Sequence, residues 1–444
     1  MKKILPGLII CLLASACHKE EPSSPTHPHT PSLAPVITSF APISGSANTI
    51  VTIRGKNFNS VATGDTVKFN GAAAVIQSAA DTVLTVLAPT TGTDGAITVS
   101  TTKGKASSSV FTYGPDVFII GTVFSNTYIP VLWKNGASYY LSGNNNYGFA
   151  TGMAVVDTNV YVSGYIFDSG GYQQGRYWKN LAEANLSEGL IRHTTNRMTV
   201  SGNDIYVTGF QEADLQNAFI NIAEYWKNGK EILLSDTTQD TRATAIAING
   251  NDVYVTGDTQ PPSLYFTNRV AALWKNGVQT KLATVGQSSF TTGIVIANND
   301  VYISGYDYDG SVTTAKYWKN GTPVLMNGNG AANDITIVGN DVYLAGYVDN
   351  GTYDIATYWK NGVPVSLTDG TAYNGVVTGI AVQGNDVYAV GYETSTHNPA
   401  TADDFLGYAA VCWKNGVRIV LNDTRTQSNG YASQVILKPH VPYH

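Results

Sequence analysis

Ten tyrosine and aspartate residues lie in segments between predicted strands, where their side chains could bind a ligand. They are Tyr172, Tyr265, Tyr306, Asp307, Tyr308, Asp309, Tyr353, Asp354, Asp403 and Asp404. An aromatic ring covers the apolar C–H face of a pyranose, and a carboxylate accepts hydrogen bonds from sugar hydroxyl groups. These residue types predict a glycan-binding surface. The alternative for each residue is that the ring packs against a neighbouring loop and the acid is solvated.

The same acids raise the question of catalysis. Two carboxylates at a suitable separation can cleave a glycosidic bond, so a polysaccharide lyase or glycoside hydrolase is an alternative function. The sequence contains no S-x-D-x-G-x-x-W box, no G-x-S-x-G or H-E-x-x-H motif and no phosphate-binding glycine loop. Only His193 and His397 lie between residues 116 and 439. We predict no catalytic residue, and a non-catalytic role fits the sequence better.

The stretch DYDG at 307–310 could hold a metal ion. Closely spaced carboxylates with backbone carbonyls suit a hard cation such as Ca²⁺, but the stretch falls far short of an EF-hand loop. A plain polar turn is the alternative. We assign no metal ligand, and the sequence predicts no other cofactor.

Seven tryptophans divide the chain after residue 115 into repeats of similar length. They are Trp133, Trp178, Trp226, Trp274, Trp318, Trp359 and Trp413. Each follows a second motif of the form D-V-Y-x-x-G, such as DVYLAGY at 341–347. Repeats of about 40–50 residues with four short strands are typical of β-propeller blades.

The unit at 378–421 shows how each repeat should fold. The strands TGIAVQ and DVYAVGY are joined by Gly384-Asn385, and the strands YAAVCWK and VRIVLN are joined by Asn415-Gly416. Asn-Gly between two strands predicts a type I′ hairpin, because both turn residues need positive φ. The WKNG tip is therefore scaffolding, and we expect each tryptophan to pack between blades.

The two ends of the repeat region complement each other. Residues 116–122 form a second strand without a first, and residues 430–439 form a first strand without a second. We therefore predict a seven-bladed propeller closed by the C-terminal strand. A closed ring leaves no open sheet edge to aggregate.

Alternating strand directions place the tight turns on one face of the propeller and the variable loops on the other. The loops are 165–175, 210–222, 258–270, 306–314, 347–355 and 392–407. They carry many acids and one basic residue, Arg269, whereas the turn face carries Lys134, Lys179, Lys227, Lys275, Lys319, Lys360 and Lys414. The sequence thus predicts charge polarised between the faces, with function on the loop face. The ring of lysines could bind an acidic polymer, or it is simply soluble turn sequence.

Residues 35–115 show period-two alternation between turn residues, which predicts an antiparallel sandwich. The stretches PVITSFAPISGSANTIVTIRGKNF, VKFNG, LTVLAP and VFTYG resemble an IPT/TIG immunoglobulin-like domain. That resemblance implies a spacer or interaction module without catalysis.

The segment 1–17 has the form of an export signal, with Lys2 and Lys3 before an apolar run and Ala14-Ser15-Ala16 before Cys17. The position of Cys17 resembles a bacterial lipoprotein box, which implies that Cys17 is lipidated. The following HKEEP resembles the surface-export signal of lipoproteins in Bacteroidota-like bacteria, and residues 18–34 form a Pro/Ser/His-rich tether. The alternative is a soluble secreted protein.

Composition limits the classes that remain. A net charge of −6 leaves no basic footprint for nucleic acid. We predict an all-β chain with a signal at 1–17, a tether at 18–34, an IPT/TIG domain at 35–115, a propeller at 116–439 and a tail at 440–444. The WKNG repeats resemble those of bacterial surface proteins. The expected function is a lipid-anchored, outer-membrane binding module for a glycan or a surface protein, and a protein-interaction scaffold is a further alternative. The oligomeric state is not predicted.

Overall fold

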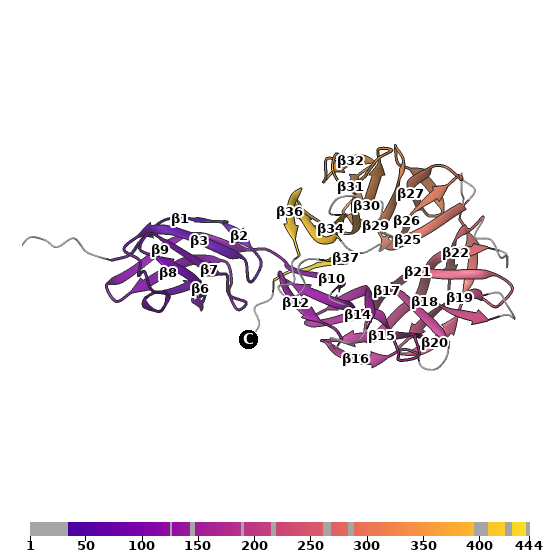
Figure 1. Ribbon diagram of the computed structural model, residues 1–444, viewed down its shortest axis with the longest axis horizontal. Helices are drawn as coiled ribbons and strands as arrows, with labels where there is room; N and C mark the ends of the chain where they lie inside the picture. The colour runs from indigo at the N-terminus through magenta and orange to yellow at the C-terminus, as the bar shows by residue number, and fades with distance from the viewer. Residues whose placement is uncertain are drawn as a thin grey trace, which may run out of the picture.

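The computed structural model describes residues 34–124, 127–142, 147–187, 191–214, 219–260, 268–282, 288–394, 407–421 and 429–440. An immunoglobulin-like sandwich is followed by a ring of sheets, so the predicted all-β fold class is confirmed (Figure 1). Cys17 and the tether lie outside the described residues. Within the described ranges, no helix has the length and apolar character to cross a membrane.

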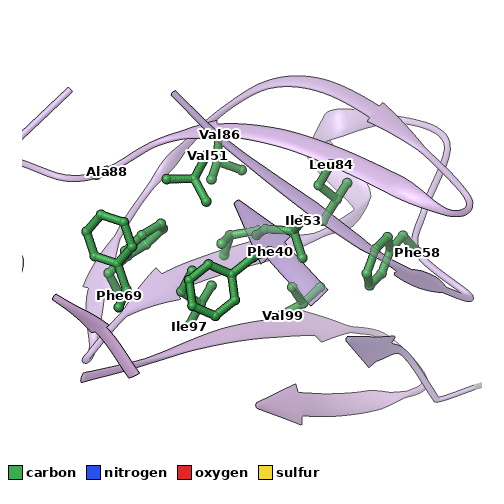
Figure 2. Close-up of a cluster of buried hydrophobic side chains, with 12 residues drawn as sticks. Phe40, Val51, Ile53, Phe58, Phe69, Leu84, Val86, Ala88, Ile97 and Val99 are labelled. Carbon is green, nitrogen blue, oxygen red and sulfur yellow. The ribbon is translucent and has the colours of Figure 1, made fainter. Parts of the chain in front are cut away.

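The sandwich consists of two sheets. One has the order β1 (Val36–Ala41), β3 (Ile50–Lys56), β7 (Val83–Leu87) and β6 (Val75–Ala80). The other has the order β2 (Ser44–Gly45), β9 (Gly104–Tyr113), β8 (Gly95–Thr101), β4 (Thr66–Phe69) and β5 (Ala72–Ala73), and a short 3₁₀ helix, η1 (Ala62–Gly64), precedes β4. Alternate residues such as Val51 and Ile53 point inward, where they pack with Phe69 and Leu84 (Figure 2). Period-two alternation thus produces the core.

The ring contains seven four-stranded sheets among the described residues, numbered here as blades 1 to 7. Blade 1 comprises β37 (Gly430–Lys438), β10 (Asp116–Phe124), β11 (Tyr128–Lys134) and β12 (Ala137–Tyr140). Blade 2 comprises β13 (Gly148–Val156), β14 (Asn159–Phe167), β15 (Gln173–Lys179) and β16 (Ala182–Asn185). Blade 3 comprises β17 (Arg192–Ser201), β18 (Asp204–Asp214), β19 (Phe219–Lys227) and β20 (Lys230–Leu233). Blade 4 comprises β21 (Asp240–Asn249), β22 (Asp252–Gln260), β23 (Val270–Lys275) and β24 (Val278–Lys281).

The remaining blades repeat this arrangement of four antiparallel strands. Blade 5 comprises β25 (Ser288–Ala297), β26 (Asp300–Tyr308), β27 (Thr313–Lys319) and β28 (Thr322–Leu325). Blade 6 comprises β29 (Gly330–Val338), β30 (Asp341–Asp349), β31 (Asp354–Lys360) and β32 (Val363–Ser366). Blade 7 comprises β33 (Gly375–Gln383), β34 (Asp386–Thr394), β35 (Tyr408–Lys414) and β36 (Val417–Val420).

The C-terminal strand closes the ring. β37 pairs antiparallel with β10 from Asp116 opposite Lys438 to Val123 opposite Gly430. The strand therefore supplies the first strand of blade 1, beside the strand that begins the propeller (Figure 1). This confirms the closure that the unmatched ends of the repeat region predict.

Each WKN tryptophan is buried at a blade boundary. All seven have less than 2% of their surface exposed. Trp413, for example, packs with Tyr343 and Ala345 of blade 6 as well as with Val377 of its own blade. The following Asn-Gly pairs adopt positive φ at both residues, as Asn415 and Gly416 do, which is the type I′ geometry. The tryptophans therefore contribute scaffold and no ligand surface.

A circle of hydrogen bonds joins the blades around the central channel. The first strand of every blade carries a one- or two-residue bulge, and each bulge contains Thr151, Asn196, Thr244, Thr292, Asn333, Thr378 or Ser433. Each of these side chains hydrogen-bonds the next blade: Thr151 to Thr195, Asn196 to Ala243, Thr244 to Thr291, Thr292 to Ala332, Asn333 to Val377, Thr378 to Ala432 and Ser433 to Ala150. Because a bulge turns a polar residue toward the next blade, the seven blades are linked in a closed cycle.

The turn face carries paired charges, which corrects the predicted polarisation. Five lysines bridge the aspartate that begins strand two of their own blade: Lys227 to Asp204, Lys275 to Asp252, Lys319 to Asp300, Lys360 to Asp341 and Lys414 to Asp386, at 2.8–3.3 Å. Each of these five lysines also lies over the tyrosine of D-V-Y or D-I-Y, and the WKN asparagine bonds the same aspartate, as Asn228 does at 2.7 Å. These lysines contact the aspartate and tyrosine of their own blade, so an acidic polymer would have to displace these intramolecular partners.

Candidate functional site

The strands continue further into the predicted loops than the sequence indicates. Strand β26 ends at Tyr308 and strand β31 begins at Asp354. Tyr306, Asp307, Tyr308 and Asp354 are therefore strand residues whose side chains alternate between the two faces of a blade. Only part of the predicted set can point toward a common ligand.

Asp307 is buried, which corrects its assignment as an exposed ligand-binding acid. Its side chain is 3% exposed and forms an ion pair with Lys316, which is fully buried. Lys316 also lies 4.1 Å from the centre of the Trp318 ring. Breaking a buried ion pair costs about 3–5 kcal/mol, so Asp307 holds the blade together and is not available at the surface.

The neighbouring residues Tyr308 and Asp309 shape a local turn. The Tyr308 hydroxyl donates to the carbonyl of Gly310 at 2.7 Å, and the Asp309 carboxylate accepts from the N–H groups of Ser311 and Val312. Those backbone bonds lower the pKa of Asp309. The two carboxylates of the DYDG stretch thus have protein partners, and within the described residues no cluster of three or more His, Cys, Asp or Glu residues could hold a metal ion.

Asp354 lies at the rim of the loop face beside a second acid. It is half-buried, and it stands opposite Asp349 in the pairing of β30 with β31. Burial, together with the charge of Asp349, raises the pKa of Asp354 to about 6. Burial followed by the charge of Asp354 raises the pKa of Tyr347 to about 12. These groups form an acid and phenol cluster on blade 6.

The other predicted residues are dispersed. Tyr172 lies in the turn between β14 and β15, and its N–H donates to Asp168. Tyr306 stacks on Phe290 with ring centroids 5.0 Å apart, and the N–H of half-buried Tyr353 donates to Asn350. Tyr265, Asp403 and Asp404 lie outside the described residues.

A cavity opens at the loop-face end of the central channel. Its volume is about 390 Å³, and it is lined by Thr151, Arg197, Asn333, Thr378, Tyr392, Tyr408, Tyr431 and Ser433. Tyr392 and Tyr408 meet edge to face at 5.0 Å. Burial raises the pKa of Tyr431 to about 12 and also raises that of Tyr392, so both phenols stay neutral at physiological pH. The lining thus combines aromatic rings with hydroxyl and amide groups, which are the groups that bind a sugar.

An ion pair crosses the channel beneath this cavity. Arg197 of blade 3 places Nη2 3.4 Å from Asp334 Oδ1 of blade 6 and donates to the carbonyl of Thr378 in blade 7. Asp334 also accepts from the N–H of Ile380, and its burial raises its pKa against the opposing effect of Arg197. The charges of the pair offset each other at the cavity floor.

A second, larger cavity of about 520 Å³ lies toward the turn face. Its walls are mainly aliphatic residues at the ends of first strands, such as Val156, Val200 and Ile248, and its lining includes no aromatic side chain among the described residues. It also contains the polar side chains of Arg197, Asp334, Gln434 and Lys438, but its described lining has no ring that could cover the apolar face of a sugar. The smaller, tyrosine-lined cavity is the better candidate site.

An aromatic platform lies beside the candidate cavity on blades 1 and 2. We define it as Phe124, Tyr128, Tyr147, Phe149, Tyr165 and Phe167, whose neighbouring rings are 4.4–5.9 Å apart. Tyr147 is its most exposed member at 36%. Blade 1 is common to the platform and the cavity: Tyr431 lines the cavity from β37, which pairs with β10, the strand that carries Phe124.

His193, the described histidine within the repeats, is buried near the loop-face end of blade 3, where it lies opposite Gln211. Its Nδ1 lies 2.9 Å from Oε1 of Glu224. Burial lowers the pKa of His193 and, with the charge of Glu231, raises that of Glu224 to about 10. The two side chains are buried and hydrogen-bonded to each other, so the pair has a structural role.

The sequence features that indicate the cavity lie in the strands and not in the loops. Tyr392 follows the glycine of DVYAVGY, as Tyr165, Tyr306 and Tyr347 follow theirs. Asn333 and Thr378 belong to the bulge positions of the first strands. Arg197 had no repeated counterpart, because most blades carry Gly or Ala at the equivalent position, such as Gly379.

A comparison with known families agrees with the first part of the architecture. Residues 35–113 match the IPT/TIG domain family, which confirms the resemblance of that segment. No curated protein matches the chain. The chain is thus an all-β protein with an IPT/TIG domain followed by a β-propeller.

Three solved structures illustrate the distance of its structural relatives. An auxiliary nutrient binding protein from Bacteroides ovatus is 14% identical over 92% of this chain and 91% of that chain, with a TM-score of 0.37. Another from Bacteroides thetaiotaomicron is 13% identical over 75% and 85%, with a TM-score of 0.37. The β-propeller domain of the Trilobed protease from Pyrococcus furiosus is 8% identical over 89% and 98%, with a TM-score of 0.41. Similarity at this level does not extend to ligand or activity.

Proposed function

We propose that the protein is a non-catalytic binding module that holds a glycan in the loop-face cavity. The observation that carries the proposal is the convergence of Tyr392, Tyr408 and Tyr431 with hydroxyl and amide side chains around about 390 Å³. Aromatic rings supply surface for sugar C–H groups, and the polar groups orient its hydroxyls.

The composition of the cavity supports binding over cleavage. A glycoside hydrolase needs two carboxyl groups flanking the bond to be broken. The described lining of the cavity contains no acidic residue. Asp349 and Asp354, which lie outside this lining at the loop-face ends of β30 and β31, could accept hydrogen bonds from hydroxyl groups of a sugar that extends across the loop face.

The proposed location is the outer surface of a bacterial outer membrane. Support comes from the sequence, in which an apolar run and Ala14-Ser15-Ala16 precede Cys17 and an acidic, Pro-rich segment follows. A lipid on Cys17 would anchor the chain, and residues 18–34 would act as the tether.

A glycan array probed with residues 18–444 tests the proposal, with new reducing ends assayed on each hit. We expect binding without new reducing ends. Replacing Tyr408 with Ala should weaken binding roughly thirtyfold, since burial of an aromatic side chain contributes about 2 kcal/mol. Tyr308→Ala, on the same face but outside the cavity lining, is the matched control. New reducing ends would favour the hydrolase, and an array without hits would favour a protein-interaction scaffold.

The same titration at lower pH tests the role of the rim. The pKa of Asp354 is about 6, so lowering the pH from about 7 to about 5 protonates it and removes a strong acceptor. We expect weaker binding at pH 5 and no such dependence in Asp354→Asn. The fold responds in the opposite sense: because the pKa is raised above 3.8, the stability contributed by this group is lost as pH rises through about 6.

A further inference from the structure

Arg197 divides the central channel into two compartments. Among the described residues that line either cavity, it is the one common to both. Its contacts with Asp334 and Thr378 span from blade 3 to blades 6 and 7. The loop-face cavity is therefore closed at its inner end.

Small neighbours show that this floor is built into the fold. The residues that follow the polar bulge positions are long and polar in Arg197, Asp334 and Gln434, but they are Gly152, Ala245, Gly293 and Gly379 in the other blades. A Cβ on Gly293 would lie 3.2 Å from Asp334 Oδ1, and one on Gly379 would lie 2.9 Å from Cα of Gln434. The small residues leave the space that the long ones fill.

We propose, resting on the glycan-binding function above, that the cavity receives the terminal residue of a neutral oligosaccharide. A site closed at one end admits a chain end and excludes an internal segment. Its volume of about 390 Å³ is near the lower end of the roughly 300–1,000 Å³ range of ligand pockets. Arg197 and Asp334 offset each other's charge, and the remaining lining side chains are uncharged, so an anionic sugar gains no net attraction.

The rest of the oligosaccharide then leaves the cavity across the loop face. Tyr431 lines the cavity from β37, and β37 pairs with β10, whose end carries Phe124 of the aromatic platform. The platform offers the partly exposed ring of Tyr147 to the second or third sugar residue. Affinity should therefore rise over the first few sugar residues and then become constant.

End-blocked oligosaccharides test this inference. Calorimetry would measure gluco-, xylo- and manno-oligosaccharides from disaccharide to hexasaccharide, each unmodified, with the reducing end coupled to 2-aminobenzamide, and with the non-reducing terminal 4-hydroxyl methylated. We expect one of the two modifications to weaken binding at least tenfold and the other to change it less than threefold. Tyr147→Ala should remove the gain with chain length while the disaccharide still binds.

A double variant, Arg197→Ala with Asp334→Ala, opens the floor without leaving a single buried charge. In this variant, checked for an unchanged circular dichroism spectrum, we expect the end-blocked form to bind as well as the unmodified form. Binding that ignores both modifications in the original protein would overturn the inference alone. Failure of every oligosaccharide to bind would overturn the proposed function together with it.

A second inference concerns the junction between the IPT/TIG domain and the propeller, and it is independent of the ligand. His440, assigned to the tail from the sequence, is only 5% exposed in its side chain. Its Nδ1 lies 2.8 Å from Asp116 Oδ1 at the start of the propeller, and its Nε2 lies 3.1 Å from the carbonyl of Gly92 in the IPT/TIG domain. Its ring stacks on Tyr113 at 4.7 Å.

We infer that His440 acts as an imidazolium clamp that fixes the two domains together. A neutral imidazole has one donor and one acceptor nitrogen, whereas both nitrogens here face acceptors. Only the cation donates to both. The charged or titratable groups around it are Asp94, Tyr113, Asp116 and Lys438. Asp116 also accepts a hydrogen bond from Asn135 and lies opposite Lys438 in the sheet, and Asp94 accepts from the N–H of Tyr113. Both bonds across the junction therefore depend on this one side chain.

Distance measurements between spin labels on the two domains test the clamp. Labels would be attached to cysteines at exposed Ser78 and Val363; Cys412 does not compete, because burial raises the pKa of its thiol to about 12. We expect a narrow distance distribution in the original protein and a broader one in His440→Ala, which keeps neither hydrogen bond of the imidazole. An equally narrow distribution in His440→Ala would overturn the clamp.

Discussion

Removal of residues 430–444 should abolish the cooperative unfolding transition of the propeller. The deletion takes away β37, and with it the partner of β10 along the register from Asp116 to Val123. Ala432 and Val435 leave the buried cluster that contains Trp133, and the circle of blade-to-blade bonds loses Ser433. A stability of about 5–15 kcal/mol for a domain cannot absorb the loss of the innermost strand of a blade. Calorimetry and light scattering should show no sharp transition and association through the open edge of β10.

Two companion measurements separate ring closure from a general effect of truncation. A chain that ends at His440 keeps β37 and should melt like the original protein. A synthetic peptide of residues 429–440, added to the truncated chain, should restore the transition by strand addition. An unchanged melting profile after the longer deletion would contradict closure.

The fold could be predicted from the sequence because its determinants are local and repeated. Asn415-Gly416 specifies a type I′ turn without reference to the rest of the chain. The same turn in most repeats, with a tryptophan shortly before it in each, defines the blade. The unmatched strands at 116–122 and 430–439 define closure by simple counting.

The candidate cavity was harder to predict, because its residues come together only when the ring closes. Thr151 and Ser433 both line it, although they lie at opposite ends of the propeller sequence. The residues predicted in the loops include Asp307, and the order of charges in the sequence does not show that its partner is Lys316. The sequence does place a lysine, Lys316, shortly before Trp318 in a strand. Such a position faces the neighbouring blade, and a lysine that is buried there needs an oppositely charged partner.

Charge on the turn face illustrates the same limit. Seven lysines in seven hairpins suggested an electropositive ring, yet the D-V-Y motif supplied aspartates to the same face. Both Asp204 and Lys227 were visible in the sequence, but their proximity depends on β18 and β19 pairing in the register that sets Tyr206 opposite Lys227. When two motifs recur together in each repeat, contact between their side chains is therefore the first hypothesis to test.

Replacement of Gly305 with Ala should destabilise the propeller strongly, although the change adds only a methyl group. Gly305 is the glycine of DVYISGY in blade 5, where the bulge of β25 brings a carbonyl over β26. A Cβ at Gly305 would overlap the carbonyl oxygen of Phe290 and would lie 2.9 Å from Cζ3 of Trp318. Backbone and a fully buried indole cannot both move aside, so we expect a loss of about 3 kcal/mol, at the upper end of the usual range for overpacking.

Gly321→Ala in the same blade is the matched comparison, because it separates backbone conformation from close packing. Gly321 has a positive φ and nothing within 4 Å of an added Cβ. It should therefore lose only the roughly 1–2 kcal/mol that a left-handed conformation costs an L-residue. Urea denaturation of both variants measures the difference. If Gly321→Ala proved the more damaging, the close-packing explanation for the glycine of D-V-Y-x-x-G would be wrong. A larger loss in Gly305→Ala would show that this glycine lets the bulged first strand and the buried tryptophan approach the second strand of the blade.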